Sequence, residues 1–165
     1  IKVVAQRVAG YLKGDFPVDM RLINGDGFAT VAMAYLLSGQ SDKLEGPLGE
    51  AFLEAIRLRW SAQLGPDASQ EEIATLFRGY EPDQMEGAIN TIKGKMFEIM
   101  VTDAENQDGD EWVATMHLDE SFPGSDIIFS NEETGVQLEV SLKAASASNA
   151  NILSRRWPST PICPL

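Results

Sequence analysis

The spacing of apolar residues changes near residue 110, and this change limits the folds open to the chain. Before it, apolar residues recur at intervals of three and four, which is typical of helices with one packed face. After it, apolar and polar residues alternate, most clearly where Val136, Leu138, Val140 and Leu142 are separated by Gln137, Glu139 and Ser141. Such alternation predicts strands with one buried face. We therefore expect an α+β fold with a helical N-terminal region followed by a small sheet.

Start and stop signals place the individual elements. We expect helices over residues 1–13, 28–37, 47–64 and 82–106, and a short helix that begins after Ser69. Ser69 and Glu72 have the spacing of a capping box, and Pro47 and Pro82 stand where proline suits a first helical turn. We expect strands over 112–118, 126–129 and 136–143, with a hairpin loop at 131–135 that contains Gly135. A short helix at 152–156 and a fourth strand at 160–163 would complete the chain.

The charge balance excludes some functions and leaves others open. The chain has 25 acidic and 13 basic side chains and a net charge of −12, which argues against a protein that coats nucleic acid electrostatically. Most of the excess lies in residues 96–165, either as solvated surface or as carboxylates around a cation. A single cysteine, Cys163, excludes an internal disulfide framework, and a single histidine, His117, excludes a three-histidine metal site.

Charged residues stand at critical points of this helix–hairpin arrangement. Glu98 lies on the long helix, Asp126 opens a strand, and Glu139 and Lys143 share the polar face of the next strand. Along a strand, Glu139 and Lys143 are about 13–14 Å apart. If the hairpin brings Asp126 beside that face, the carboxylates converge with one amine. Oxygen ligands of this kind suit Mg²⁺, which polarises phosphate and activates a bound water.

Three segments carry a resemblance to a known superfamily. They are KGKMFE at 93–98, PGSDIIF at 123–129 and LEVSLK at 138–143. In this order, over about residues 82–165, they resemble the PD-(D/E)xK nucleases, whose restriction-endonuclease-like fold has a helix with Glu, a hairpin with Asp and a strand with an acid and Lys. The resemblance implies a small mixed sheet, a Mg²⁺ or Mn²⁺ cofactor, and a nucleic acid substrate, DNA or RNA, of which we expect DNA first.

The resemblance also implies a role for each residue. Asp126 would be the bridging metal ligand, Lys143 would hold the attacking water, and Glu98 would add the helix carboxylate. In the family an acid, sometimes Gln, stands two residues before the lysine, whereas this chain has Ser141. Glu139 is the substitute on the same strand face, displaced by about 7 Å at the backbone. We therefore expect Lys143, Asp126 and Glu139 to be catalytic, and Asp126, Glu139 and Glu98 to bind the metal.

Plainer interpretations stand beside these. Asp126, Glu139 and Glu98 suit exposed positions on a strand or helix, and Lys143 suits the end of an edge strand. Ser141 is expected to pack or to form a hydrogen bond. The acidic residues between 103 and 111 lack the residue order of an EF-hand and are expected to form a solvated loop. Arg155, Arg156 and Trp157 suit either contact with nucleic acid or the end of a helix.

These observations give one leading function and two alternatives. We expect a Mg²⁺-dependent nuclease domain over residues 81–165, preceded by a helical region over 1–80 that regulates access or binds a protein partner. The first alternative is a catalytically inactive module on the same fold that binds proteins, which Ser141 and the net charge favour. The second, prompted by a chain that opens on Ile1, is a toxin-type nuclease domain of a larger protein. Because no apolar run reaches the 18–20 residues or so that span a bilayer, we expect a cytoplasmic protein without a membrane partner.

Overall fold

The order of elements follows the change in apolar spacing. The computed structural model describes residues 27–117 and 126–142. Its helical elements are α3 (Gly27–Leu37), the short 3-10 helix η1 (Ser41–Leu44), α4 (Pro47–Arg59), α5 (Gln70–Phe77) and α6 (Pro82–Gln107). Its strands are β1 (Trp112–Met116), β2 (Ile127–Asn131) and β3 (Gln137–Val140). The expected α+β fold with helices first is confirmed. The expected elements at 1–13, 152–156 and 160–163 lie outside the described residues.

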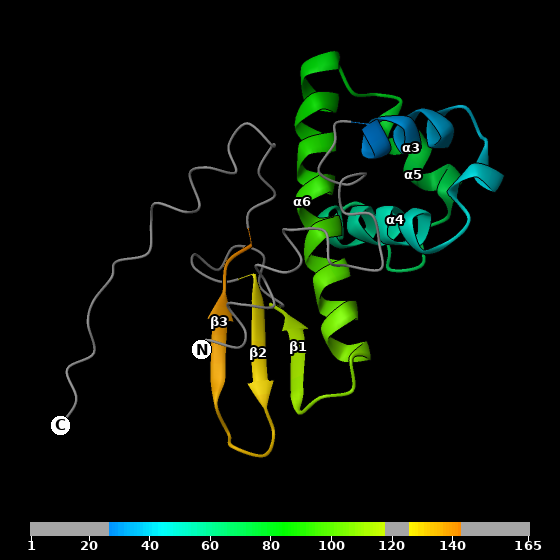
Figure 1. Ribbon diagram of the computed structural model, residues 1–165. Coiled ribbons are helices and arrows are strands. Elements are labelled where there is room, and N and C mark those ends of the chain that lie inside the picture. Colours follow the sequence, from blue (N-terminus) through cyan, green and yellow to red (C-terminus); the bar gives the residue numbers. More distant parts are fainter. Residues whose placement is uncertain (1–26, 118–125, 143–165) are drawn as a thin grey trace.

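The long helix α6 connects the two parts of the structure. Figure 1 shows α3, α4 and α5 on one side of α6 and the three-stranded sheet on the other. Buried apolar side chains from both sides form one cluster, in which Phe52 and Ile56 of α4 belong with Ile92 and Met96 of α6 and Phe129 of β2. All five are fully buried. Burying this apolar area is what holds the helices and the sheet to α6.

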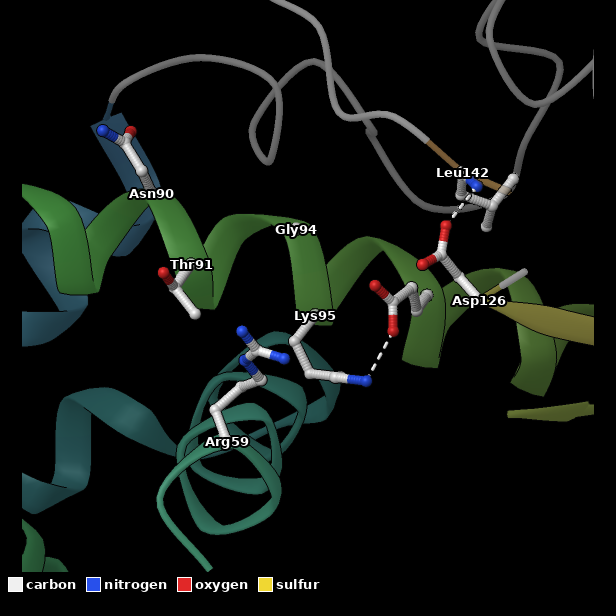
Figure 2. Close-up of a pocket in the computed structure, with 8 residues that line it drawn as sticks. Arg59, Asn90, Thr91, Gly94, Lys95, Asp126 and Leu142 are labelled. Carbon is white, nitrogen blue, oxygen red and sulfur yellow. Dashed lines mark hydrogen bonds and ion pairs between the residues drawn. The ribbon is translucent and has the colours of Figure 1, made fainter. Parts of the chain in front are cut away.

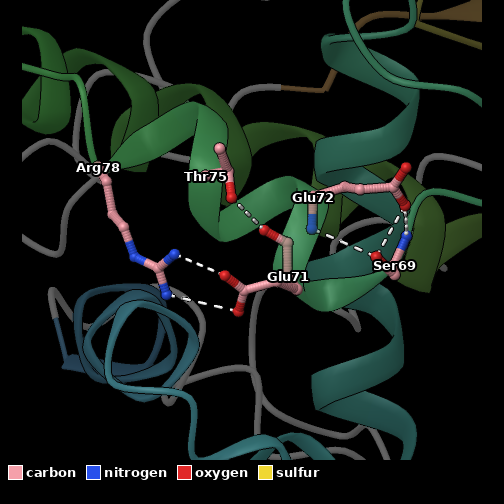
Figure 3. A network of polar contacts seen from close by, with 5 residues as sticks. All are labelled: Ser69, Glu71, Glu72, Thr75 and Arg78. Carbon is pink, nitrogen blue, oxygen red and sulfur yellow. Dashed lines mark hydrogen bonds and ion pairs between the residues drawn. The ribbon is translucent and has the colours of Figure 1, made fainter.

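The local signals at helix starts are present in the structure. Pro47 and Pro82 are each the first residue of their helices. At α5, Ser69 Oγ accepts a hydrogen bond from the Glu72 backbone N–H at 3.2 Å, and the Glu72 carboxylate accepts one from the Ser69 backbone N–H at 2.8 Å. Figure 3 shows this predicted capping box, together with the ion pair between Arg78 and Glu71.

The sheet is an antiparallel meander in the order β1-β2-β3. Ile127 and Phe129 of β2 are buried on the face towards the core, and β3 pairs with this strand so that Phe129 lies opposite Leu138. The last turn of α6 fixes the outer edge of β1. The side-chain amide of Asn106 donates to the Ala114 carbonyl at 2.9 Å and accepts from the Ala114 N–H at 2.8 Å. One amide therefore substitutes for a neighbouring strand at this position.

Some expected boundaries differ from those observed. The third strand is shorter than 136–143, because the N–H of Asn131 bonds to the carbonyl of Val136 and draws that residue into the turn. Gly135 in this turn has a φ of 68°, which favours glycine.

The acidic residues from 103 onwards do not form one solvated loop. Glu105 lies on α6 and is 1% exposed, so this expectation is wrong for it. Among the described helices, none is both long and apolar enough to span a membrane.

Candidate functional site

A pocket of about 300 Å³ opens between α6, the end of α4 and the sheet. Its lining is polar except for two members, and consists of Arg59, Asn90, Thr91, Gly94, Lys95, Glu98, Asp126 and Leu142. Figure 2 shows α6 running along the pocket, with Asn90 and Thr91 towards one end and Asp126 and Leu142 at the other. Two of the four residues expected to form the site, Glu98 and Asp126, therefore line the same pocket although they are distant in sequence.

Glu98 is held in the pocket by a short ion pair. Its carboxylate Oε2 lies 2.6 Å from the Lys95 ammonium Nζ, one helical turn earlier on α6. The two side chains are only 8% and 14% exposed, for Lys95 and Glu98 respectively. At this degree of burial each charge stabilises the other, because a buried charge without a partner lowers the stability of the folded protein. The pair fixes where the Glu98 carboxylate lies within the pocket wall.

The pocket is the open end of a longer polar stripe along α6. Residues three and four apart lie on one helix face, and the polar members of this face are Thr91, Lys95, Glu98, Thr102 and Glu105. The most buried of them is Glu105, near the end of the helix. Within the described residues, the buried hydroxyl of Thr102 has no hydrogen-bond partner. Buried polar groups are normally satisfied, so the Thr102 hydroxyl is the exception among these residues.

Asp126 is oriented by the chain that follows β3. Its Oδ2 accepts hydrogen bonds from the Leu142 backbone N–H at 2.6 Å and from Ser141 Oγ at 2.9 Å. Within the described part of the chain, no group donates to the other oxygen, Oδ1. Backbone bonds from His117 to the Asp126 carbonyl and from Asp126 to the Val140 carbonyl hold the main chain in place. One carboxylate oxygen is thus fixed by the protein.

Ser141 is therefore a hydrogen-bonding residue, as expected. It stands where the PD-(D/E)xK pattern has an acid, and it donates to the same Asp126 oxygen as the Leu142 N–H. The hydroxyl brings no negative charge to this end of the pocket. The arrangement differs from a pair of acids, which would repel each other unless a cation lay between them.

Glu139 does not line this pocket. In the register of the sheet it lies opposite Ile128, and it is exposed. Its neighbours Leu138 and Val140 pack towards the core, so by strand alternation Glu139 points to the other face of the sheet. The expected convergence of Glu139 with Asp126 is not seen. Lys143 lies outside the described residues.

Two charged residues of the pocket were not predicted from the sequence. Arg59 is the last residue of α4, and Figure 2 shows its side chain extending towards α6 near Lys95. Nothing in the local sequence around Arg59 indicates this, because α4 and α6 meet only in the folded chain. Lys95 did carry a signal, since it precedes Glu98 by three residues and such pairs face each other on a helix.

Two carboxylates in the pocket could act as ligands of one hard cation, and a third is not present in its lining. Mg²⁺ is usually held by one or two carboxylates, with water and substrate phosphate completing its octahedron. Glu98 and Asp126 supply two carboxylates to one pocket. No cluster of three or more His, Cys, Asp or Glu side chains suited to a metal occurs within residues 27–117 and 126–142. The described residues therefore bring two carboxylates to this pocket, and not the three that were expected with Glu139.

Comparison with protein-family models, with curated proteins and with solved structures found no match to the chain.

Proposed function

We propose that the chain is a metal-dependent phosphodiesterase that hydrolyses nucleic acid, DNA or RNA, on a restriction-endonuclease-like fold. The observation that carries this proposal is that Glu98 and Asp126 line one polar pocket from separate elements. A helix carboxylate paired with a hairpin carboxylate is also the arrangement that the resemblance to PD-(D/E)xK nucleases implies.

Each residue of the pocket has its own role in this proposal. Glu98 and Asp126 would hold Mg²⁺, and the bound ion would supply Lewis-acid activation of phosphate and of a water molecule. Ser141 and the Leu142 N–H keep one Asp126 oxygen in place. Lys95 holds Glu98 through its ion pair. Lys143, which follows Leu142 directly, keeps the role of orienting the attacking water that the resemblance implies.

The pocket answers part of the charge objection to a nucleic acid substrate. The chain as a whole has a net charge of −12, which repels phosphate. The pocket has two cationic side chains, Arg59 and Lys95, against the two carboxylates Glu98 and Asp126. Its formal charge is therefore zero before a divalent ion binds and positive afterwards. A phosphate group meets a locally favourable field even though the surrounding surface is acidic.

The direct test is hydrolysis of labelled duplex and single-stranded DNA and RNA in Mg²⁺ or Mn²⁺. Asp126→Asn keeps the hydrogen-bond acceptor but removes the charge. We expect it to reduce the rate by about 100-fold or more, because loss of a residue that only supports a metal ligand already costs about 10–100-fold. Glu139→Gln removes an equal charge from outside the pocket and is the matched control, with a rate near wild type. Lys143→Ala tests the residue outside the described ranges and should lower the rate sharply.

Equal rates in wild type, Asp126→Asn and Lys143→Ala would reject this site. Absence of metal-dependent hydrolysis on every substrate would favour the second candidate, a catalytically inactive module that binds a protein. A specific observation supports that candidate. Lys95 already neutralises Glu98, and Ser141 and Leu142 already occupy one oxygen of Asp126, as in a site stabilised without a metal.

A further inference from the structure

We propose that Gly94, which has no side chain, leaves the space in which the sugar–phosphate backbone of a nucleic acid strand fits against helix α6. The inference rests on the proposed function for the identity of this ligand. It assigns to Gly94 the sugar next to the phosphate that reacts at Glu98 and Asp126. The missing side chain is then a determinant of substrate binding.

Gly94 lies within the long helix α6 and lines the pocket. Figure 2 shows it between the end of the pocket at Asn90 and the end at Asp126. Gly94 precedes Glu98 by four residues, so the two are neighbours on one helix face, about 6 Å apart along the axis. A strand whose phosphate contacts an ion held by Glu98 and Asp126 therefore has its adjoining sugar within reach of Gly94.

Neither the backbone nor the packing of the described residues requires glycine at this position. Inside a helix, glycine is less favourable than alanine because its backbone loses more conformational freedom on folding. The backbone of Gly94 is not in the left-handed region, where glycine would be favoured. A Cβ at Gly94 would have no heavy atom of the described residues within 4 Å, its own stretch of helix apart. A side chain at this position would therefore enter open space in the pocket.

Two other glycines show what distinguishes Gly94. A Cβ at Gly49 of α4 would collide with the backbone carbonyl of Leu44, so packing requires glycine there. Gly87 of α6, like Gly94, has open space around its Cβ position among the described residues. Gly87 is exposed, however, and it does not line the pocket. The pocket is therefore the difference between Gly94 and Gly87, and Gly87 is a matched control on the same helix.

The proposed contact depends on space and does not need an unpaired polar group. The hydroxyl of Thr91 donates to the Gly87 carbonyl at 2.9 Å, and the Lys95 ammonium is paired with Glu98. A sugar is compact and uncharged, so it fits against a helix surface whose neighbouring polar groups are already engaged. The charge of the phosphate is met by the ion, one helical turn further along α6.

The test compares alanine and leucine at position 94 with the same substitutions at position 87. Both are good helix formers, so Gly94→Ala and Gly87→Ala should each raise the Tm of the full chain by about 2–4 °C. Thermal unfolding followed by circular dichroism measures this shift and shows whether each variant is folded. A fall in Tm for Gly94→Ala would indicate a packing role of the kind seen at Gly49, and it would overturn the inference.

Hydrolysis of labelled DNA and RNA in Mg²⁺ then measures the effect of filling the space. We expect Gly94→Ala to raise KM about threefold and Gly94→Leu about tenfold or more, because an inserted side chain competes with the substrate for room. The change in kcat should be smaller, since the ground state and the transition state lose the same contact. Gly87→Leu should keep KM within about twofold of wild type, as is usual for a surface substitution.

Equal KM values for Gly94→Leu and Gly87→Leu would overturn the inference, and hydrolysis that still depends on Asp126 would then keep the nuclease. If wild type hydrolyses no substrate, fluorescence anisotropy of a short fluorescein-labelled single-stranded DNA in Mg²⁺ replaces the kinetics. Binding that is weakened by Gly94→Leu and not by Gly87→Leu would keep the contact and reject the nuclease. Absence of DNA binding by wild type, or equal binding by both leucine variants, would reject the contact as well.

Discussion

At the scale of single residues, Asp126 shows how the chain manages a departure from the pattern that it resembles. Where a second acid is expected, the Ser141 hydroxyl donates to Asp126 Oδ2. The bond satisfies this oxygen without a metal, whereas a second acid would repel Asp126 unless a cation or a shared proton lay between them. Serine therefore allows this end of the pocket to form in the absence of a cation, and it leaves any bound ion with fewer protein ligands.

Restoring the acid gives the first prediction. Ser141→Asp places a second carboxylate beside Asp126, so we expect lower thermal stability in EDTA because like charges repel. Mg²⁺ should then raise the Tm of this variant more than that of wild type, because a ligand that binds the folded state stabilises it in proportion to its affinity. Differential scanning fluorimetry with increasing Mg²⁺ measures both effects. Equal Mg²⁺ responses in the two proteins would argue against the placement of Ser141 at a metal site.

The ion pair of Lys95 and Glu98 gives a second prediction. Because both side chains are largely buried, Glu98→Leu leaves the Lys95 charge without this partner and should cost about 3–5 kcal/mol of unfolding free energy. The double variant Lys95→Met with Glu98→Leu should lose less than Glu98→Leu alone, since neither charge of the pair remains. Urea unfolding measures the single variants and the double variant. Losses that simply add in the double variant would show that the two side chains do not depend on each other.

At the scale of elements, α5 is a short helix whose stability depends on its first turn. Hydrogen bonds from the Ser69 backbone N–H and then from its side chain hold the pKa of Glu72 below the ordinary value of 4.5. The Arg78 guanidinium lowers the pKa of Glu71 in the same way, first by hydrogen bonding and then by its charge. A lowered pKa in the folded state means stabilisation that is complete above the unfolded pKa and is lost as pH falls through the folded one.

The third prediction follows from this sign. Ser69→Ala should cost about 1 kcal/mol at neutral pH through loss of the N-cap. It should also move the pKa of Glu72 part of the way back towards 4.5, because the backbone N–H of residue 69 still donates. Titration of the Glu72 side chain by NMR in both proteins checks the pKa, and the stability difference should narrow below pH 4.5. An unchanged Glu72 pKa would show that the Ser69 hydroxyl does not donate to the Glu72 carboxylate in solution.

Local chemistry explains why the elements could be predicted and where the prediction stopped. Pro47, Pro82 and the Ser69–Glu72 pair act within one helical turn, so the sequence near them is sufficient to place a helix start. The side chain of Asn106 acts eight residues away on Ala114, and no local pattern marks it. The end of β2 at Asn131 depends in the same way on a bond to Val136 across the turn.

The same division applies to the candidate site. Glu98 and Asp126 could be predicted because the resemblance specifies a helix acid and a hairpin acid, and the fold brings them to one pocket. Glu139 was expected there from the sequence, but strand alternation directs it to the opposite face. Arg59 could not be predicted, because its place depends on how α4 packs against α6.

At the scale of the whole molecule, the described residues share one apolar cluster that runs from α3 to the end of β3. The pocket lies between α4, α6 and the sheet, and its lining comes from α4, from α6 and from Asp126 and Leu142, which flank the β2–β3 hairpin. The helical part therefore contributes to the candidate site directly. The division of the chain at residues 80 and 81 into two functional units stays a prediction.

The net charge of −12 bears on how the whole molecule could approach nucleic acid. An acidic protein that acts on nucleic acid needs a region of positive electrostatic potential to attract phosphate. A divalent ion held by Glu98 and Asp126 beside Arg59 would provide it. The proposed function therefore depends above all on a divalent cation bound in this pocket through these two carboxylates. Hydrolysis requires that ion.

Binding of Mn²⁺ to the full chain, followed by electron paramagnetic resonance of the free ion, measures this directly. We predict saturable binding at one site in wild type and Glu139→Gln, and binding weaker by about tenfold or more in Asp126→Asn and Glu98→Gln. Mg²⁺ should compete for the same site. Binding that is absent from wild type, or equally strong in all four proteins, would rule out a cation held by Glu98 and Asp126.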